Sequence, residues 1–280
     1  MIKISNLLKY YRKHDVIQIS NFEFSDGIIY GIVGANGSGK STLMKCLTNL
    51  VDYSGEVLYD GLELKSHPEV LKDAGIIIET PMFYNDMTAN ENLEYFLPAG
   101  IDTSELLERL ELADFADDKV KTYSLGMKQK LAIILACLKG NKVIILDEPF
   151  NGLDIKSVKV VIDILLEEKS KGKTIIVSSH MPKTINKLCD EIFKIENKNL
   201  QCYAKSTNSK KYIFTFDSIA KTENARVYLK GKSRWNAYSM GFDLIVDCKT
   251  QEDLKEVLSI LVDFDMVSYE EMSQEMEAIY

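Results

Sequence analysis

The pattern of apolar and polar residues along the first 200 positions predicts strands that alternate with helices. Residues 143–146 and 174–178 are continuous apolar runs of strand length, which is typical of parallel strands covered on both faces. Between them, residues 157–171 have the pattern of a helix that Gly172 closes. Short alternating runs within residues 1–25 indicate further strands. This order predicts an α/β architecture.

Residues 88–138 have a mainly helical pattern, and they predict a helical subdomain at about 85–140 within the α/β part. Asp102, followed three residues later by Glu105, has the spacing of a capping box at a helix start. Glu91 and Asn92 indicate another helix start. Apolar positions then recur near helical spacing at Leu106, Leu107, Leu110 and Leu112.

The pattern changes near residue 200, which divides the chain into domains 1–204 and 205–280. A polar segment at 205–211 predicts a linker. The order that follows is β-α-β-β-α-β, the split ferredoxin-like pattern of a small α+β domain. We expect its strands at 212–216, 234–238, 242–247 and 266–269 and its helices at 218–229 and 251–262. Residues 273–280 are expected to form a short helix or a tether to a partner.

Composition and charge limit the kinds of partner and the cellular compartment that we expect for this protein. The 280 residues are 46% hydrophobic, which supports a substantial core. The net charge of −8 argues against a nucleic-acid partner. The five cysteines show no metal or redox spacing and are expected to be reduced, as in a cytoplasmic protein. The apolar run 131–138 is too short to span a bilayer, so we expect membrane association only through a partner.

A phosphate-binding loop is the strongest chemical signal in the sequence. Residues 34–41 read Gly-Ala-Asn-Gly-Ser-Gly-Lys-Ser, between an apolar strand-like segment and a helix-like one. Glycines let backbone N–H groups close around phosphate oxygens, and the following helix start favours an anion. The Lys40 ammonium would bind the terminal phosphates, and the Ser41 hydroxyl is a candidate Mg²⁺ ligand. The expected phosphate-binding residues are Gly34, Asn36, Gly37, Gly39, Lys40, Ser41 and Thr42.

A pair of carboxylates at the end of a predicted strand forms the second chemical signal. Asp147 ends the apolar run 143–146, and a parallel strand would carry it to the sheet edge that holds the phosphate loop. There it can hold Mg²⁺ through water. Glu148 leaves the strand and is free to orient an attacking water. Paired with the phosphate loop, the two residues predict nucleotide hydrolysis rather than a chance acidic cluster.

Three further segments complete a family pattern over residues 1 to about 200. They read Tyr-Ser-Leu-Gly-Met-Lys-Gln (123–129), Asn-Gly-Leu-Asp (151–154) and Ser-Ser-His (178–180). With the two signals above, they make the chain resemble the ATP-binding subunits of ABC transporters. The resemblance implies a P-loop ABC-type ATPase with a mixed sheet and a helical subdomain.

The resemblance also implies roles for individual residues. Tyr11 stands where the family stacks adenine on an aromatic ring. Ser124 and Gly126 match the signature loop, which contacts the γ-phosphate bound to the opposite subunit. Asp154 matches the loop that links the two sites across a dimer, and His180 matches the switch histidine on the γ-phosphate. Lys40, Glu148 and His180 are accordingly the expected catalytic residues.

Two positions depart from the family's usual residues. The signature loop lacks the middle glycine and the glutamine, although Ser124 and Gly126 are kept. Glu79 stands where the family normally has a glutamine that bridges Mg²⁺ to the transmembrane partner. A carboxylate is also a hard oxygen ligand, so Glu79 joins Ser41 and Asp147 as a candidate metal ligand. Both departures are similar to the branch of bacitracin-resistance and lantibiotic self-protection transporters.

The resemblance further implies how the protein works. Two copies would bind two ATP molecules with Mg²⁺ in a head-to-tail dimer, closing with ATP and reopening after hydrolysis. A separate transmembrane permease would convert this movement into transport, with the ATPase held at the inner face of the cell membrane. The branch favours export of a peptide antibiotic or a similar compound, and import stays open.

Two rival interpretations come from other functional classes. One is a soluble ATPase of the same superfamily that acts on DNA ends or ribosomes without transport. The stretch between Glu79 and Ser124 is too short for the coiled-coil insertion of DNA-repair members, and ribosome-acting members usually carry two cassettes. The other rival is a regulatory subunit that does not hydrolyse ATP, against which the presence of Glu148 argues.

Overall fold

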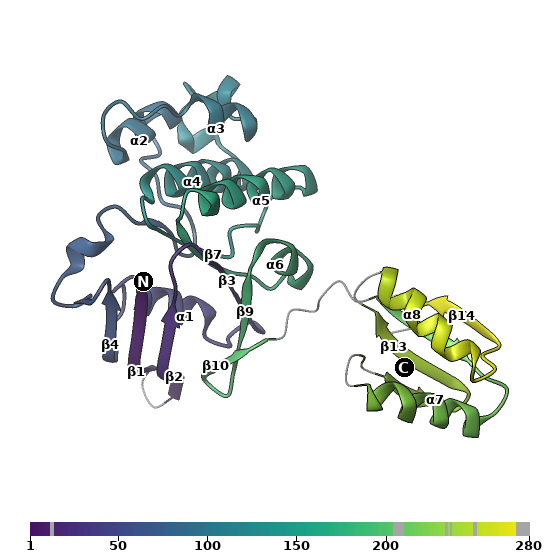
Figure 1. Cartoon of the computed structure of the whole chain (residues 1–280). Helices are drawn as coiled ribbons and strands as arrows, with labels where there is room; N and C mark the ends of the chain where they lie inside the picture. Colours follow the sequence, from purple (N-terminus) through teal and green to yellow (C-terminus); the bar gives the residue numbers. More distant parts are fainter. Residues whose placement is uncertain (12–13, 204–209, 233–234, 236, 249–250, 273–280) are drawn as a thin grey trace. The chain divides into compact units, whose positions relative to one another are not determined.

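The computed structural model describes residues 1–11, 14–203, 210–232, 235, 237–248 and 251–272 (Figure 1). The chain forms two compact units, which we call the N-terminal unit (Met1–Lys205) and the C-terminal unit (Ser206–Tyr280). In the described part, no helix is both long and apolar enough to cross a membrane.

The N-terminal unit contains ten strands and six α-helices within its described residues. Its strands are β1 (Ile2–Tyr11), β2 (His14–Phe24), β3 (Ile29–Val33), β4 (Ser54–Tyr59), β5 (Leu62–Glu63), β6 (Gly75–Ile77), β7 (Val143–Asp147), β8 (Thr174–Ser178), β9 (Glu191–Glu196) and β10 (Asn199–Cys202). Its helices are α1 (Lys40–Leu47), α2 (Ala89–Phe96), α3 (Ser104–Arg109), α4 (Leu125–Lys139), α5 (Ile155–Ser170) and α6 (Pro182–Leu188). Short 3₁₀ turns lie at Pro68–Leu71, Ala113–Phe115 and Val120–Thr122.

Two sheets organise the N-terminal unit. The larger has the order β10-β9-β3-β8-β7-β6, in which β9, β3, β8, β7 and β6 are parallel and β10 is antiparallel. The smaller is antiparallel with the order β2-β1-β4-β5. The sequence prediction of an α/β fold with a mixed sheet is therefore confirmed.

Helices cover both faces of the larger sheet, which explains its continuous apolar strands. On one face, Ile145 and Ile176 pack in a core with Leu43 and Met44 of α1 and with the antiparallel sheet. On the other face, apolar residues of β7 and β8 pack against α4, α5 and α6. Figure 1 shows α2, α3 and α4 gathered away from β1, β2 and β4.

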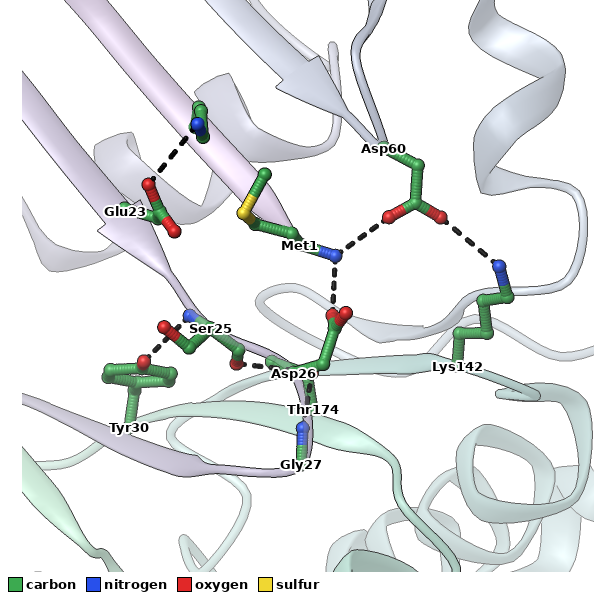
Figure 2. A network of polar contacts seen from close by, with 10 residues as sticks. Met1, Glu23, Ser25, Asp26, Gly27, Tyr30, Asp60, Lys142 and Thr174 are labelled. Atoms are coloured by element: carbon green, nitrogen blue, oxygen red, sulfur yellow. Dashed lines mark hydrogen bonds and ion pairs between the residues drawn. The ribbon is translucent and has the colours of Figure 1, made fainter.

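Polar contacts join the two sheets at the end where β7 and β8 begin (Figure 2). Asp60, just after β4, accepts a hydrogen bond from Lys142 Nζ at 3.1 Å, just before β7. Thr174 Oγ1, at the start of β8, accepts from the Gly27 N–H at 3.1 Å. These contacts lie at the amino ends of β7 and β8, opposite the carboxyl ends of these two strands.

The structure corrects one helix start. Asp102 does not form a capping box with Glu105, because α3 begins after Thr103 and has no side-chain cap. Asp102 Oδ1 instead accepts from the N–H and the hydroxyl of Ser104, which makes a local turn before the helix. The capping box of this subdomain is formed by Thr88 and Glu91 at the start of α2.

The C-terminal unit has the element order β-α-β-β-α-β in its described residues. Its elements are β11 (Lys210–Thr215), α7 (Ile219–Gly231), β12 (Ala237–Met240), β13 (Asp243–Cys248), α8 (Gln251–Val262) and β14 (Ser268–Glu271). They form an antiparallel sheet with the order β12-β13-β11-β14. β11 already begins at Lys210, inside the segment predicted as a linker. The remaining linker residues, positions 234 and 236 of a predicted strand, and the segment 273–280 lie outside the described residues.

Candidate nucleotide site

The carboxyl ends of four neighbouring parallel strands bring the candidate site residues to one edge of the larger sheet. The phosphate loop follows β3, His180 follows β8, Asp147 and Glu148 lie at the end of β7, and Glu79 follows β6. Ligands of open α/β sheets bind at this edge, outside the carboxyl ends of the strands. The sheet order therefore assembles segments that lie far apart in the sequence.

The phosphate loop turns tightly before α1. Gly39 has a φ of 108°, a backbone conformation that residues other than glycine rarely adopt. A Cβ at this position would also lie 2.9 Å from Cδ1 of Ile17, so β2 packs closely against the loop. Lys40 is only 6% exposed, and its Nζ donates to the carbonyl oxygens of Gly34 at 2.8 Å and Ala35 at 3.3 Å. The loop thus holds this ammonium group over its own turn.

A cavity of about 330 Å³ opens beside the loop. Most of the predicted phosphate-binding and catalytic residues contribute to its wall. It is lined by Val16, Asn36, Gly37, Gly39, Lys40, Ser41, Thr42, Glu148, Asn151 and His180. The wall therefore combines a buried cation, hydroxyl groups and a carboxylate.

Glu148 links the cation of the loop to the histidine. Its Oε1 lies 3.6 Å from Lys40 Nζ, and its Oε2 lies 2.8 Å from His180 Nδ1. Oε2 also accepts from the backbone N–H of His180 at 3.2 Å. Glu148 has a φ of 49°, and strained backbone of this kind clusters at functional sites. The left-handed turn directs the carboxylate from the end of β7 toward Lys40 and His180.

Asp147 is held in place from the adjacent strand. It is 4% exposed, and one of its carboxylate oxygens accepts a hydrogen bond from the Ser178 hydroxyl of β8. The same hydroxyl oxygen accepts from the Glu148 N–H at 2.9 Å. Ser178 therefore fixes both carboxylate-bearing residues.

Two elements that border the site carry hard oxygen donors suited to Mg²⁺. The donors are the Asp147 carboxylate at the end of β7 and the Ser41 hydroxyl in the first turn of α1. Mg²⁺ commonly takes one or two protein oxygens and completes its octahedron with substrate phosphates and water. Among the described residues there is no cluster of three His, Cys, Asp or Glu that would form an all-protein metal site. The donor set therefore fits a metal that arrives with a phosphate ligand.

The predicted signature residues do not line this cavity within the described part of the chain. Ser124 caps α4, and its Oγ accepts from the Met127 N–H at 3.2 Å. Its own hydroxyl hydrogen can still be donated to another acceptor. A Cβ on Gly126 would lie 2.7 Å from the carbonyl oxygen of Gly152, so only glycine permits this close approach. The signature loop therefore packs against the segment that follows Glu148.

Tyr11, Asp154 and Glu79 also lie outside the described cavity wall. The Tyr11 ring is 44% exposed at the end of β1, and Lys9 Nζ lies 4.6 Å from its centroid. Asp154 caps α5, and hydrogen bonds from the N–H and hydroxyl of Ser157 lower the pKa of its carboxyl. Glu79 forms an ion pair with Lys45 of α1. The roles assigned to Tyr11, Asp154 and Glu79 stay predictions.

Several residues that the sequence prediction did not assign lie in the site or next to it. Asn151 lines the cavity, and Ser178 orients the carboxylates. Ser38 Oγ is buried without a hydrogen-bond partner in the described structure, inside the predicted phosphate loop. Gln129 is 4% exposed and donates from Nε2 to the Pro149 carbonyl at 3.1 Å, next to Glu148. Only their positions within the recognised motifs could have drawn attention to them.

Comparisons with a family model and with individual proteins both match this chain to ABC transporter proteins. The family described as "ABC transporter" matches residues 17–151. The lantibiotic transport ATP-binding protein SrtF of Streptococcus pyogenes is 38% identical over 197 residues, which span 69% of this chain and 85% of that protein. The bacitracin transport ATP-binding protein BcrA of Enterococcus faecalis is 37% identical over 202 residues, spanning 69% of this chain and 65% of that protein.

A solved structure described as the ATP-binding subunit of an ABC transporter has the same fold. It aligns with a TM-score of 0.66 and 27% identity, covering 74% of this chain and 90% of that chain. The relatives with transport names also match the branch that the two departures in the sequence indicated.

Proposed function

The chain belongs to the ABC transporter family and is an ATPase of that family, and we propose that it drives a separate membrane-spanning permease that exports a peptide antibiotic or a similar compound. Two of its relatives are described as lantibiotic and bacitracin transport proteins, which supports this class of substrate. In this proposal the protein works at the inner face of the cell membrane, where the permease holds it.

The observation that carries the ATPase part of the proposal is that Lys40, Ser41, Glu148 and His180 line one and the same cavity. The cavity wall joins an ammonium group for phosphate charge with a carboxylate for water. Phosphoryl transfer needs mainly positioning and charge neutralisation, and this wall supplies groups for both.

The residues of the chain would act on ATP as follows. Lys40 and the amides of the phosphate loop bind the β- and γ-phosphates. Mg²⁺, held by Ser41 and Asp147, would neutralise phosphate charge when it is bound. Glu148 orients and polarises the attacking water, and His180, within hydrogen-bond distance of Glu148, fixes the γ-phosphate geometry.

A second copy of the chain would complete each site. Ser124 and Gly126 lie outside the wall of the described cavity, which supports their use by the opposite subunit in a head-to-tail dimer. The close approach of Gly126 to Gly152 and the bond from Gln129 to Pro149 tie the signature helix to the segment after Glu148. A phosphate on the signature loop could thereby affect the catalytic carboxylate of the same subunit.

The experiment that tests transport is purification of this protein from its native membranes, followed by identification of the membrane-spanning protein that copurifies with it. We expect a stable complex whose ATP hydrolysis rises with the exported peptide. ATP hydrolysis with no membrane partner, unaffected by any candidate peptide, would favour the soluble ATPase instead.

Adenine stacking on Tyr11 gives a separate prediction. Tyr11→Ala should weaken ATP binding roughly 5- to 100-fold, because base stacking on an aromatic ring contributes about 1–3 kcal/mol. Tyr11→Phe keeps the ring face and should stay within about twofold of the wild type in a titration with fluorescent ATP.

The exposed neighbour Tyr10 supplies the matched control for this pair. Tyr10→Ala should bind ATP normally. Equal losses in Tyr11→Ala and Tyr11→Phe would assign the contact to the hydroxyl, and a loss only in Tyr10→Ala would move the stacking to that ring.

We further propose that residues 205–280 form an accessory domain outside the ATP site. All residues lining the described cavity precede Met181, which supports this division. A protein that ends at Tyr203 should therefore bind ATP with unchanged affinity, measured by the same titration. A soluble, folded truncated protein that does not bind ATP would contradict the two-domain proposal.

A further inference from the structure

Lys45 is a charged residue beside the site that neither the sequence motifs nor the proposed mechanism use. It lies on α1 four positions after Ser41, and residues at this spacing share one face of a helix. Its Nζ donates a hydrogen bond to Oε1 of Glu79, and the two side chains form an ion pair. Lys45 is 24% exposed and Glu79 is 61% exposed. The Lys45 side chain and the candidate metal ligand Ser41 thus lie on the same face of α1, about one turn apart.

Lys45 contacts Glu79 and interacts electrostatically with two further residues that were assigned to the site on other grounds, Tyr11 and Asp147. The pKa of its ammonium group is raised, chiefly by the hydrogen bond from Lys45 to Glu79 and further by electrostatic interaction with Glu79, Tyr11 and Asp147, against the opposing effect of desolvation. The candidate adenine-stacking ring and the buried carboxylate at the end of β7 therefore lie within electrostatic range of this one cation. No other residue of α1 apart from Lys40 carries a positive charge.

The backbone at Glu79 supports a specific placement of its carboxylate. Glu79 follows β6 by two residues and has a φ of 60°, which costs about 1–2 kcal/mol for a residue other than glycine. Glu148 follows the neighbouring strand β7 with a similar φ of 49°. The two acidic residues thus leave adjacent strands through left-handed turns, one directed to Lys40 and the other to Lys45.

We propose that Lys45 is a positioning residue that holds Glu79 and neutralises its charge, and that this pair sets how strongly the site prefers Mg–ATP to Mg-free ATP. The inference rests on the proposed ATP site. A carboxylate beside the phosphates would repel the nucleotide, and an adjacent ammonium group removes that cost. The pair then has a net charge of zero, while the Glu79 carboxylate stays available as an oxygen ligand for the metal.

The charges of the nucleotide and of Glu79 determine whether each variant raises or lowers the preference for Mg–ATP. Mg²⁺ neutralises part of the triphosphate charge, so an unpaired Glu79 repels Mg-free ATP more than Mg–ATP. Lys45→Met should therefore raise the ratio of the Kd in EDTA to the Kd in Mg²⁺ roughly three- to tenfold. Glu79→Gln leaves Lys45 unpaired and should lower this ratio by a similar factor. The double variant removes both charges and should return to within about twofold of the wild type.

The experiment is a titration of the full-length protein with a fluorescent ATP analogue, in excess Mg²⁺ and in EDTA. Lys45→Arg keeps the charge and should retain the wild-type ratio. Lys142→Met is the matched control, because it removes one lysine from the ion pair with Asp60 beyond the opposite end of β7. It should leave both dissociation constants unchanged. Thermal unfolding without nucleotide should shift by only about 2 °C in Lys45→Met, because exposed ion pairs contribute little stability.

Several results would overturn the inference. They are an unchanged ratio in Lys45→Met, a ratio in the double variant that stays far from the wild-type value, or a large loss of thermal stability that marks Lys45 as merely structural. Failure of the wild-type protein to bind ATP in Mg²⁺ is a different result, because it overturns the proposed function itself. Normal binding by the wild type without the charge cancellation overturns only the role of Lys45.

Discussion

Lys40→Ala is expected to abolish ATP hydrolysis and to weaken ATP binding by roughly one to two orders of magnitude. Hydrogen bonds to charged groups contribute about 1.5–3 kcal/mol, and the Lys40 ammonium is buried in the wall of the nucleotide cavity. The stabilisation of developing phosphate charge would be lost in addition, which costs about 10²- to 10³-fold in turnover. The measurements are a fluorescent-ATP titration and a phosphate-release assay.

Lys142→Ala is the control for this variant. Lys142 lies just before β7, at the end of the sheet opposite the site, and pairs with Asp60 at the surface (Figure 2). Its removal should leave binding and turnover unchanged. Wild-type turnover in Lys40→Ala would rule out the assignment of residues 34–41 as the phosphate loop.

Glu148→Gln is expected to bind ATP normally but to hydrolyse it about 10²- to 10⁴-fold more slowly. The amide keeps the shape of the side chain, yet it accepts a proton poorly, and general-base catalysis is worth about this factor. The contacts of Glu148 with Lys40 and His180 place its carboxylate between the phosphate cation and the histidine. Glu94→Gln, an exposed glutamate on α2, supplies the control and should hydrolyse ATP at the wild-type rate.

The same variant tests the dimer. Because hydrolysis is blocked while binding is kept, ATP should trap Glu148→Gln as a dimer that elutes earlier in size-exclusion chromatography. Adding a Ser124→Ala change should weaken this dimer, since the hydroxyl donor of the signature loop is lost. A monomer that carries bound ATP would speak against the head-to-tail mechanism.

The residue types within short segments were enough to predict much of the candidate site from the sequence. The phosphate loop needs glycine at a position with a φ of 108°, and a lysine and a serine directly after it, so its composition identifies it. Strands covered on both faces must be apolar throughout, which marked β7 and β8. Since parallel strands end at one edge of a sheet, the apolar run before Asp147 and Glu148 was enough to predict that they meet the phosphate loop.

Contacts between distant segments could not be read in this way. Asp102 and Glu105 have the spacing of a capping box, yet Ser104 binds Asp102, and the turn formed there overrides the pattern. Strand order is likewise decided by packing: β3 lies between β8 and β9, and β7 lies between β8 and β6. No local propensity specifies these neighbours.

The sequence by itself determined the α/β class and predicted the phosphate loop and the carboxylate pair, because each depends on the size, charge or backbone freedom of adjacent residues. Only the tertiary structure decided which side chains face each other. Glu148 points to Lys40 and His180, Glu79 to Lys45, and Gln129 to Pro149, across separations that no spacing rule covers. The physical reason is that backbone turns after β6 and β7 and the order of the strands set these directions, and both depend on the packed core as a whole.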